Sequence, residues 1–284
     1  MSDASPGASG DFRIMGVINV TPDSFSDGGR YLAAQAAIEH GLDLEAEGAT
    51  ILDVGGESTR PGAAPVPESE ELRRVISVIE GLLERGVSAQ ISIDTSKAGV
   101  ALRALEAGAT LVNDVTALRG DASMAQVVAD AGADCCLMHM LGDPRTMQRD
   151  PRYGDVVGDI KSFLEERMAF ALAEGVALER ILVDPGIGFG KTLEHNLELL
   201  RRLDELVELG RPVVIGTSRK SFLGRLTGRE VDDRVAATIA TSVLAYERGA
   251  SVFRVHDVAP VRDALTVAAA TVPAPWKNRT STTR

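Results

Sequence analysis

One junction recurs seven times along the chain and constrains its fold more than any other feature. Each time a helical pattern ends at a glycine and a short run of apolar, often β-branched residues follows; the glycines are Gly48, Gly86, Gly108, Gly132, Gly175, Gly210 and Gly249. Glycine suits the left-handed residue that closes a helix because it has no Cβ to clash. Runs that are nearly all apolar are typical of parallel strands covered on both faces.

Together with an opening strand near residues 14–20, the seven junctions predict eight strands that alternate with helices. Such alternation indicates an α/β protein with a parallel sheet. Eight units in a chain of 284 residues favour a closed (β/α)8 TIM barrel in a single domain. Counting alone leaves an open, doubly wound sheet as the alternative. We place the barrel at residues 12–272, between a disordered N-terminal tail, 1–11, and a flexible C-terminal tail, 273–284.

Composition argues against several classes of function. The formal net charge of −11 disfavours general binding of nucleic acid or of an anionic membrane, because both present phosphate. No apolar run is long enough to span a membrane and the first ten residues do not resemble a signal peptide, so we expect a cytoplasmic protein. The adjacent Cys135 and Cys136 would point to opposite faces of a strand, and we interpret them as buried thiols.

Polar or charged residues end almost every predicted strand. Active sites of barrel enzymes lie at the C-terminal ends of the strands, so these residues should converge on one rim. In chain order they are Asn19, Asp53, Asp94, Asn113 with Asp114, His139, Asp184, Ser218 with Arg219 and Lys220, and Arg254 with His256. Buried carboxylates, amides and cations are costly unless they are paired or used. The rim is therefore the predicted active site.

The rim residues divide into two chemical groups. Asp94, Asn113 and Asp184 supply acceptors and an amide, which suit a flat heterocycle with N–H donors and ring nitrogens. A second group suits a phosphate or pyrophosphate, and it consists of Lys220, Arg254 and His256. The residues alone therefore indicate a nitrogenous ring that carries phosphate.

Eight segments resemble the signature segments of the dihydropteroate synthase family. They occur in the order of that family and cover about residues 15–267; here they read MGVINVTPDSFSDGG, DVGGESTRPGA, SIDTSK, VNDV, LMHM, DPGIGFGK, GTSRKSFLG and RVHDV. The resemblance implies a transferase of folate biosynthesis that joins p-aminobenzoate to 6-hydroxymethyl-7,8-dihydropterin pyrophosphate. The products are 7,8-dihydropteroate and pyrophosphate. Members of the family are sulfonamide targets and are usually homodimers.

The resemblance also assigns roles to individual residues. It implies a pterin site made of Asp94, Asn113, Asp184 and Lys220, to which we add Met138, a residue of the core or a contact of the pterin. Among these residues we predict catalytic roles for Asp94, Asp184 and Lys220. The residues implied to meet pyrophosphate are Asn19, Arg254 and His256, with Mg²⁺ held at Asn19. The residues implied to shape the p-aminobenzoate site are Phe25, Thr59, Arg60, Pro61, Phe189, Lys220 and Ser221.

Two other functions remain open from the sequence. A pterin-dependent methyltransferase would share the pterin-holding Asp and Asn, but it has no reason to keep the SRK and RVHD segments for pyrophosphate. The second alternative is a homologue that binds pterin without turnover. The roles of Asp53, Glu57 and Arg219 are also open, because each would either act in the site or only brace the rim.

Overall fold

The computed structural model describes residues 12–20, 30–59, 62–144 and 146–271. Its strands are β1 (Arg13–Asn19), β2 (Ile51–Gly55), β3 (Gln90–Asp94), β4 (Leu111–Asp114), β5 (Asp134–Met138), β6 (Ile181–Asp184), β7 (Val214–Ile215) and β8 (Val252–Val255). Its α-helices are α1 (Arg30–Glu47), α2 (Glu68–Glu84), α3 (Ala98–Glu106), α4 (Met124–Ala131), α5 (Val156–Ala173), α6 (Leu193–Arg201), α7 (Asp204–Val207), α8 (Ser221–Thr227), α9 (Val235–Glu247) and α10 (Val258–Thr271). Two short 3-10 helices are η2 (Leu178–Arg180) and η3 (Val231–Asp233).

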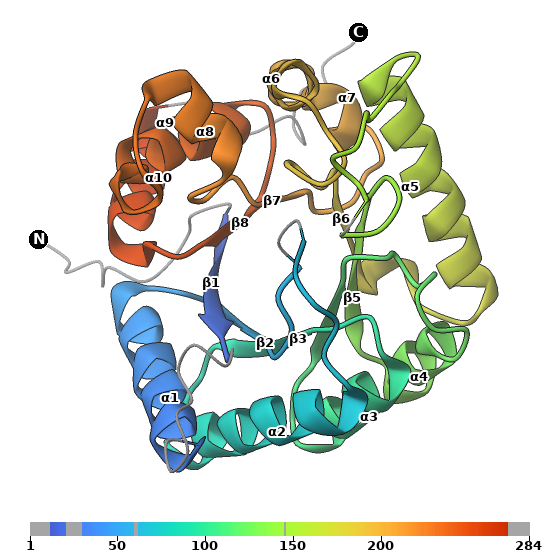
Figure 1. Cartoon of the computed structure of the whole chain (residues 1–284), viewed down its shortest axis with the longest axis vertical. Helices are drawn as coiled ribbons and strands as arrows, with labels where there is room; N and C mark the ends of the chain where they lie inside the picture. Colours follow the sequence, from blue (N-terminus) through green and yellow to red (C-terminus); the bar gives the residue numbers. More distant parts are fainter. Residues whose placement is uncertain (1–11, 21–29, 60–61, 145, 272–284) are drawn as a thin grey trace, which may run out of the picture.

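The strands form an eight-stranded parallel sheet in the order β6-β5-β4-β3-β2-β1-β8-β7. An isolated parallel bridge between Val183 of β6 and Val213, next to β7, joins the two edges. The Val183 N–H also donates to the Pro212 carbonyl at 3.0 Å. The helices surround the strands (Figure 1). The predicted (β/α)8 barrel is therefore confirmed, and the open sheet is wrong. The predicted tails, 1–11 and 273–284, lie outside the described residues.

The junction glycines adopt the conformation that the sequence predicts. All seven have positive φ, from 58° at Gly132 to 111° at Gly108. Gly132 is the left-handed cap of α4, and its N–H donates to Ala129 O at 3.0 Å. A residue with a Cβ is disfavoured in this region of φ, so glycine ends the helix at little conformational cost. Each junction therefore stops one helix and directs the chain into the next strand.

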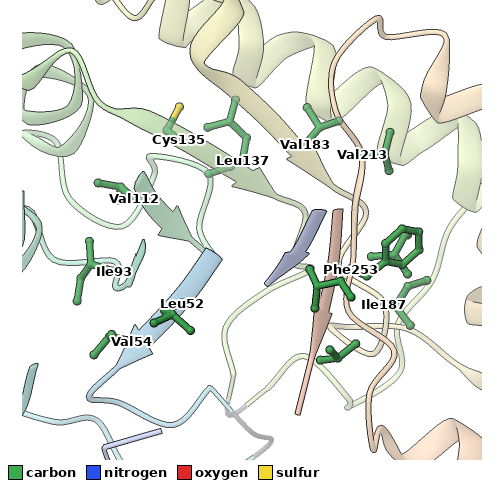
Figure 2. Close-up of a cluster of buried hydrophobic side chains, with 14 of the residues drawn as sticks. Leu52, Val54, Ile93, Val112, Cys135, Leu137, Val183, Ile187, Val213 and Phe253 are labelled. Atoms are coloured by element: carbon green, nitrogen blue, oxygen red, sulfur yellow. The ribbon is translucent and has the colours of Figure 1, made fainter. Parts of the chain in front are cut away.

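The two faces of the strands build two separate apolar clusters, because side chains alternate along a strand. The outward residues pack under the helices in the main core; Figure 2 labels Leu52, Val54, Ile93, Val112, Cys135, Leu137, Val183, Ile187, Val213 and Phe253. The inward residues form a smaller cluster inside the barrel: Met15, Ile51, Leu111, Cys136, Leu182, Val214 and Val252. Cys135 and Cys136 lie in different clusters as free, buried thiols, as predicted.

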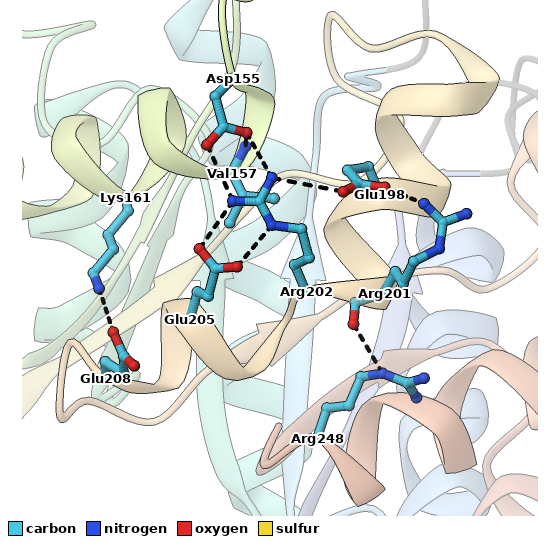
Figure 3. Close-up of polar contacts among 9 residues, drawn as sticks. All are labelled: Asp155, Val157, Lys161, Glu198, Arg201, Arg202, Glu205, Glu208 and Arg248. Atoms are coloured by element: carbon cyan, nitrogen blue, oxygen red, sulfur yellow. Dashed lines mark hydrogen bonds and ion pairs between the residues drawn. The ribbon is translucent and has the colours of Figure 1, made fainter.

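Ion pairs tie three outer helices together around Arg202, which follows α6 (Figure 3). Its guanidinium bonds both oxygens of Asp155, the N-cap of α5, at 2.7 and 3.0 Å, and both oxygens of Glu205 in α7 at 2.7 and 3.0 Å. These side chains are partly exposed to solvent, so the pairs fix local geometry more than they stabilise the fold. Among the helices of the described ranges, none has the length and apolarity that crossing a membrane requires.

Candidate active site

Four strands carry an inward polar residue two positions after an inward apolar one. Inward positions recur every second residue, and parallel strands all point the same way. The polar residues therefore lie together, one step nearer the C-terminal rim than the inner apolar cluster. The four apolar and polar pairs are Ile51 with Asp53, Leu111 with Asn113, Leu182 with Asp184, and Val252 with Arg254.

Asp53 is the centre of a buried hydrogen-bond network. Its side chain is 0% exposed; Oδ1 accepts from Ser92 Oγ at 2.6 Å, and Oδ2 accepts from Asn113 Nδ2 at 3.0 Å and from Arg254 Nε at 2.6 Å. These three partners come from β3, β4 and β8, so the network crosses the interior of the barrel. A carboxylate this deeply buried requires such partners. The network therefore gives Asp53 a bracing role inside the site.

Arg254 joins Asp53 to Asp94, since its Nη2 donates to Asp94 Oδ2 at 2.7 Å. Burial raises the pKa of Asp94 to about 7; Arg254 opposes this rise, while Asp53 and other nearby acids add to it. Burial lowers the pKa of Arg254, but the attraction of Asp53 and Asp94 outweighs burial, and the net shift is upward. Asp94 is thus an acid that titrates near neutrality beside a permanently charged guanidinium.

Asp184 and Lys220 approach the site from the ends of neighbouring strands, β6 and β7. Asp184 Oδ1 accepts from Gly186 N at 2.6 Å, and a Cβ at Gly186 would lie 1.9 Å from His139 O, so this turn requires glycine. Burial raises the pKa of Asp184, although the charge of Lys220 and the Gly186 hydrogen bond oppose it. Burial lowers the pKa of Lys220 to about 8, against the attraction of Asp184. Shifts of both groups toward neutrality are typical of functional sites.

Phe189 brings the two predicted substrate sites together. The Lys220 ammonium lies 4.7 Å from the centre of the Phe189 ring and also donates to Ile187 O. Phe189 packs against a small apolar cluster formed by Val115, Met138, Met140 and Met147. Phe189 is predicted to contact p-aminobenzoate and Met138 to contact the pterin. The structure therefore places Met138 in the apolar cluster against which Phe189 packs.

Lys191 is a buried residue that sequence reasoning missed. It is 3% exposed, and its Nζ lies 3.0 Å from His139 Nδ1 and donates to Phe189 O at 2.9 Å. Burial lowers the pKa of Lys191 well below its ordinary value, and burial with the charge of Lys191 lowers the pKa of His139 to about 3. The pair supports the backbone of Phe189. Its only signal in the sequence was the place of the lysine at the end of DPGIGFGK.

The loops after β7 and β8 are linked by side chains of the rim. His256 Nδ1 lies 3.0 Å from Ser218 Oγ, which also accepts from the His256 N–H at 3.2 Å. Arg219 forms a two-pronged ion pair with Asp257, at 3.1 Å from Nε and 2.7 Å from Nη2. Arg219 therefore pairs with an acid on the rim, which is one of the two readings that the sequence left open.

A cavity of about 200 Å³ connects the loop after β2 with the rim. Thr59 and Pro65 line it on the loop side, and Asp94 and Met140 line it on the barrel side. The loop residue Glu57 also lines the cavity, and its carboxylate binds Lys97 and the Val66 N–H. Glu57 therefore braces this loop, and the cavity joins a predicted p-aminobenzoate residue, Thr59, to a predicted pterin residue, Asp94.

The remaining predicted residues have different positions. Asn19 ends β1 with an exposed side chain, and Ser221 begins α8 directly after Lys220. Three predicted p-aminobenzoate residues lie outside the described residues, and they are Phe25, Arg60 and Pro61. Within the described ranges, no group of three or more His, Cys, Asp or Glu residues is arranged to hold a metal ion.

Known proteins resemble this chain over most of its length. The sequence model of the family described as "Pterin binding enzyme" matches residues 15–256. A dihydropteroate synthase from Escherichia coli K12 is 43% identical over 266 residues, which cover 94% of this chain and 94% of the relative. One from Mycobacterium leprae is 46% identical over 265 residues, which cover 91% of this chain and 93% of the relative. The chain belongs to the dihydropteroate synthase family.

Solved structures of this family share the barrel. The Xanthomonas albilineans dihydropteroate synthase with 4-aminobenzoic acid is 50% identical, has a TM-score of 0.85, and is matched over 92% of this chain and 94% of that chain. The Yersinia pestis dihydropteroate synthase with a sulfonamide drug complex is 42% identical, with a TM-score of 0.87 and coverage of 95% and 99%. The resemblance seen in the sequence is confirmed, and the family is one of transferases in folate biosynthesis.

Proposed function

We propose that this chain joins p-aminobenzoate to 6-hydroxymethyl-7,8-dihydropterin pyrophosphate. The observation that carries the proposal is the hydrogen-bonded group of Asp53, Asp94, Asn113 and Arg254 at one rim of the barrel, where Asp184 is also buried. This group provides the acceptors, the amide and the cation that a charged pterin requires. Relatives whose structures contain 4-aminobenzoic acid and 7,8-dihydropteroate support the identity of the substrate and product.

We assign the pterin ring to Asp94, Asn113, Asp184 and Lys220, with Met138 against its face. The carboxylates would accept hydrogen bonds from ring N–H groups. The Nδ2–H of Asn113 donates to Asp53, which would leave its amide oxygen to accept a hydrogen bond from the ring. Thr59, Phe189, Lys220 and Ser221 would hold p-aminobenzoate, together with the predicted Phe25, Arg60 and Pro61.

Pyrophosphate is assigned to Asn19, Arg254 and His256. Mg²⁺ binds oxygen ligands and commonly combines one or two protein ligands with substrate phosphates and water, so the single amide oxygen of Asn19 fits such a site. When bound, the ion offsets negative charge on the leaving group. Ser218 orients the ring of His256 through its contact with Nδ1. Arg254 keeps its positive charge because Asp53 and Asp94 raise its pKa.

The reaction breaks the bond between the pterin methylene carbon and the pyrophosphate oxygen. The positive charge that develops on this carbon spreads into the reduced ring, and a negative Asp184 beneath the ring would stabilise it. The Gly186 N–H holds the Asp184 carboxylate in one orientation. The aryl amine of p-aminobenzoate then forms the new C–N bond and releases a proton. Because the carbon is already positive, no strong base is needed.

Pyrophosphate release tests the proposal. The substrate is dihydropterin pyrophosphate with Mg²⁺, assayed with and without p-aminobenzoate. We expect release that depends on p-aminobenzoate and that a sulfonamide inhibits competitively against it. Absence of release, with pterin still bound, would instead support a binding protein or a pterin-dependent methyltransferase. Gel filtration of the same sample tests the homodimer that the family resemblance implies.

A further inference from the structure

One lysine outside the proposed mechanism joins three parts of the barrel. Lys97 is the N-cap residue of α3, and its ammonium contacts Glu57 in the loop after β2 and Glu71 in α2. The Glu71 side chain is 0% exposed, whereas those of Glu57 and Lys97 are 23% and 24% exposed. The three charges therefore meet at the edge of the protein interior, where water screens them less than at an open surface.

Glu57 bonds one end of the loop to the other. Its Oε1 accepts from the Val66 N–H at 3.0 Å, while its Oε2 contacts Lys97. Arg74 of α2 holds the beginning of the same loop, since its Nη1 donates to Gly56 O at 2.8 Å. The described ends of the loop are thus fixed by charge-assisted hydrogen bonds, which are stronger than neutral ones.

Lys97 is also attached to the end of β3, three residues after Asp94. Its backbone N–H donates to Thr95 Oγ1 at 3.2 Å. The cavity beside the rim has Glu57, Thr59, Glu71 and Asp94 among its lining residues. Lys97 therefore lies where the loop that carries Thr59 is attached to the strand that carries Asp94.

The buried Glu71 depends on this lysine. Its Oε1 has no hydrogen-bond partner among the described residues, and its Oε2 contacts Lys97. Burial lowers the pKa of Lys97, but Glu57 and Glu71 outweigh burial and raise it overall, so the ammonium is charged at neutral pH. Removal of Lys97 would leave a buried carboxylate without a cation, which is strongly unfavourable. The base of the loop would then have to move to hydrate Glu71.

We propose that Lys97 is a positioning residue for p-aminobenzoate. By holding Glu57 and Glu71 together, it sets the place of Thr59 relative to Asp94, although it touches no reacting atom. This inference rests on the proposed function, in which Thr59 belongs to the p-aminobenzoate site. If the role of Lys97 were purely structural, its replacement would lower the stability of the protein. It would leave the ratio of the KM for p-aminobenzoate to the KM for the pterin substrate unchanged.

The experiment compares Lys97→Met and Lys97→Arg with the unaltered enzyme in steady-state assays. We expect Lys97→Met to raise the KM for p-aminobenzoate about tenfold, while kcat and the KM for the pterin substrate change by less than about twofold. Lys97→Arg keeps the charge and should restore most of the affinity. The matched control is Lys161→Met, which removes a surface ion pair with Glu208 of 2.6 Å and should leave both constants unchanged.

Glu57→Gln supplies a second, milder variant, because it keeps an acceptor for the Val66 N–H and removes the charge. If Lys97 and Glu57 act through their mutual contact, the double variant Lys97→Met with Glu57→Gln should have the same KM for p-aminobenzoate as Lys97→Met alone. Equal changes in both Michaelis constants, or an unchanged p-aminobenzoate KM in active Lys97→Met and Glu57→Gln, would overturn the inference.

Amide exchange separates this inference from the proposed function. Without substrates, exchange at Val66 should become faster in Lys97→Met than in the unaltered protein, and unchanged exchange would count against the role of Lys97. If the unaltered protein makes no dihydropteroate, the proposed function fails on that assay alone.

Discussion

The interior of the barrel has two layers of opposite chemistry built from the same strands. Along β6, Leu182 is 3% exposed and belongs to the inner apolar cluster, whereas Asp184, two residues later, is 6% exposed and ionisable. Along β8, Val252 belongs to the same cluster, and Arg254, two residues later, is charged and 25% exposed. Burial by itself therefore does not identify a structural core. The layer of buried ionisable groups identifies the site, because charge is costly to bury unless it is used or paired.

Arg254→Met should separate the two layers most strongly. The change leaves Asp53 and Asp94 buried without their guanidinium, and breaking such pairs costs about 4 kcal/mol of unfolding free energy. Urea denaturation measures this loss, and turnover should be lost as well. Adding Asp53→Asn should recover part of the stability, because one unpaired charge is removed, but none of the activity. Full stability in Arg254→Met would mean that the layer of ionisable groups does not depend on ion pairs for its stability.

Asp184→Asn should remove most of the turnover, by roughly 100- to 1,000-fold in kcat, while pterin binding weakens less. Single-turnover rates and pterin titration measure the two effects, and equal losses would mean that Asp184 mainly binds. Asp114→Asn is the matched control. Asp114 is a fully buried aspartate at the end of β4, but its carboxylate accepts from the Thr116 and Leu118 N–H groups at 2.8 Å. The Asp114→Asn variant should be less stable than the unaltered protein but should keep its kcat.

Leu182→Ala tests the inner apolar cluster on the same strand as Asp184. We expect a loss of about 3 kcal/mol in unfolding free energy, because the change removes buried methyl groups and leaves a cavity. The kinetic constants of the folded enzyme should stay close to those of the unaltered protein. A large change in the kcat of the fully folded variant would show that the inner apolar cluster also affects the chemistry.

The pH dependence should give the smallest effect. Lys220 is charged below its pKa of about 8 and neutral above it. If the charge holds the substrates, kcat/KM should fall as pH rises through that value, by about tenfold per unit for a single group. Initial rates across the alkaline range measure this limb. In Lys220→Arg the limb should move to higher pH, because a guanidinium stays charged.

Much of the fold was predictable because its signals are local. A glycine that closes a helix and an apolar run that follows it are read within ten residues, and all seven junctions have the expected conformation. The short β7 was less predictable, since only Val214 and Ile215 are assigned to it. How its edge meets β6 depends on the curvature of the whole sheet, which no local pattern specifies.

The convergence of the strand-end residues was predictable from the sequence, whereas the hydrogen bonds among them were less so. Residues at strand ends converge because parallel strands share one direction, so Asp94, Asn113 and Asp184 followed from position. The contact between Asp53 and Arg254 joins residues 201 positions apart, and its geometry appears only when the barrel closes. The pairing of Lys191 with His139 is of the same kind, at a separation of 52 residues.

The closure of the barrel has a consequence for ligand binding. The edges of the sheet meet at the bridge between Val183 and Val213, and the Lys220 ammonium donates to Ile187 O across the same junction. A pterin held by Asp184 on one side and Lys220 on the other would link the two edges of the sheet. Amide exchange at residues 213–215 should then slow more on pterin binding than exchange in β3, and equal slowing in both would contradict this view. If exchange at residues 213–215 slows more, the bound substrate stabilises the closure of the barrel in addition to reacting inside it.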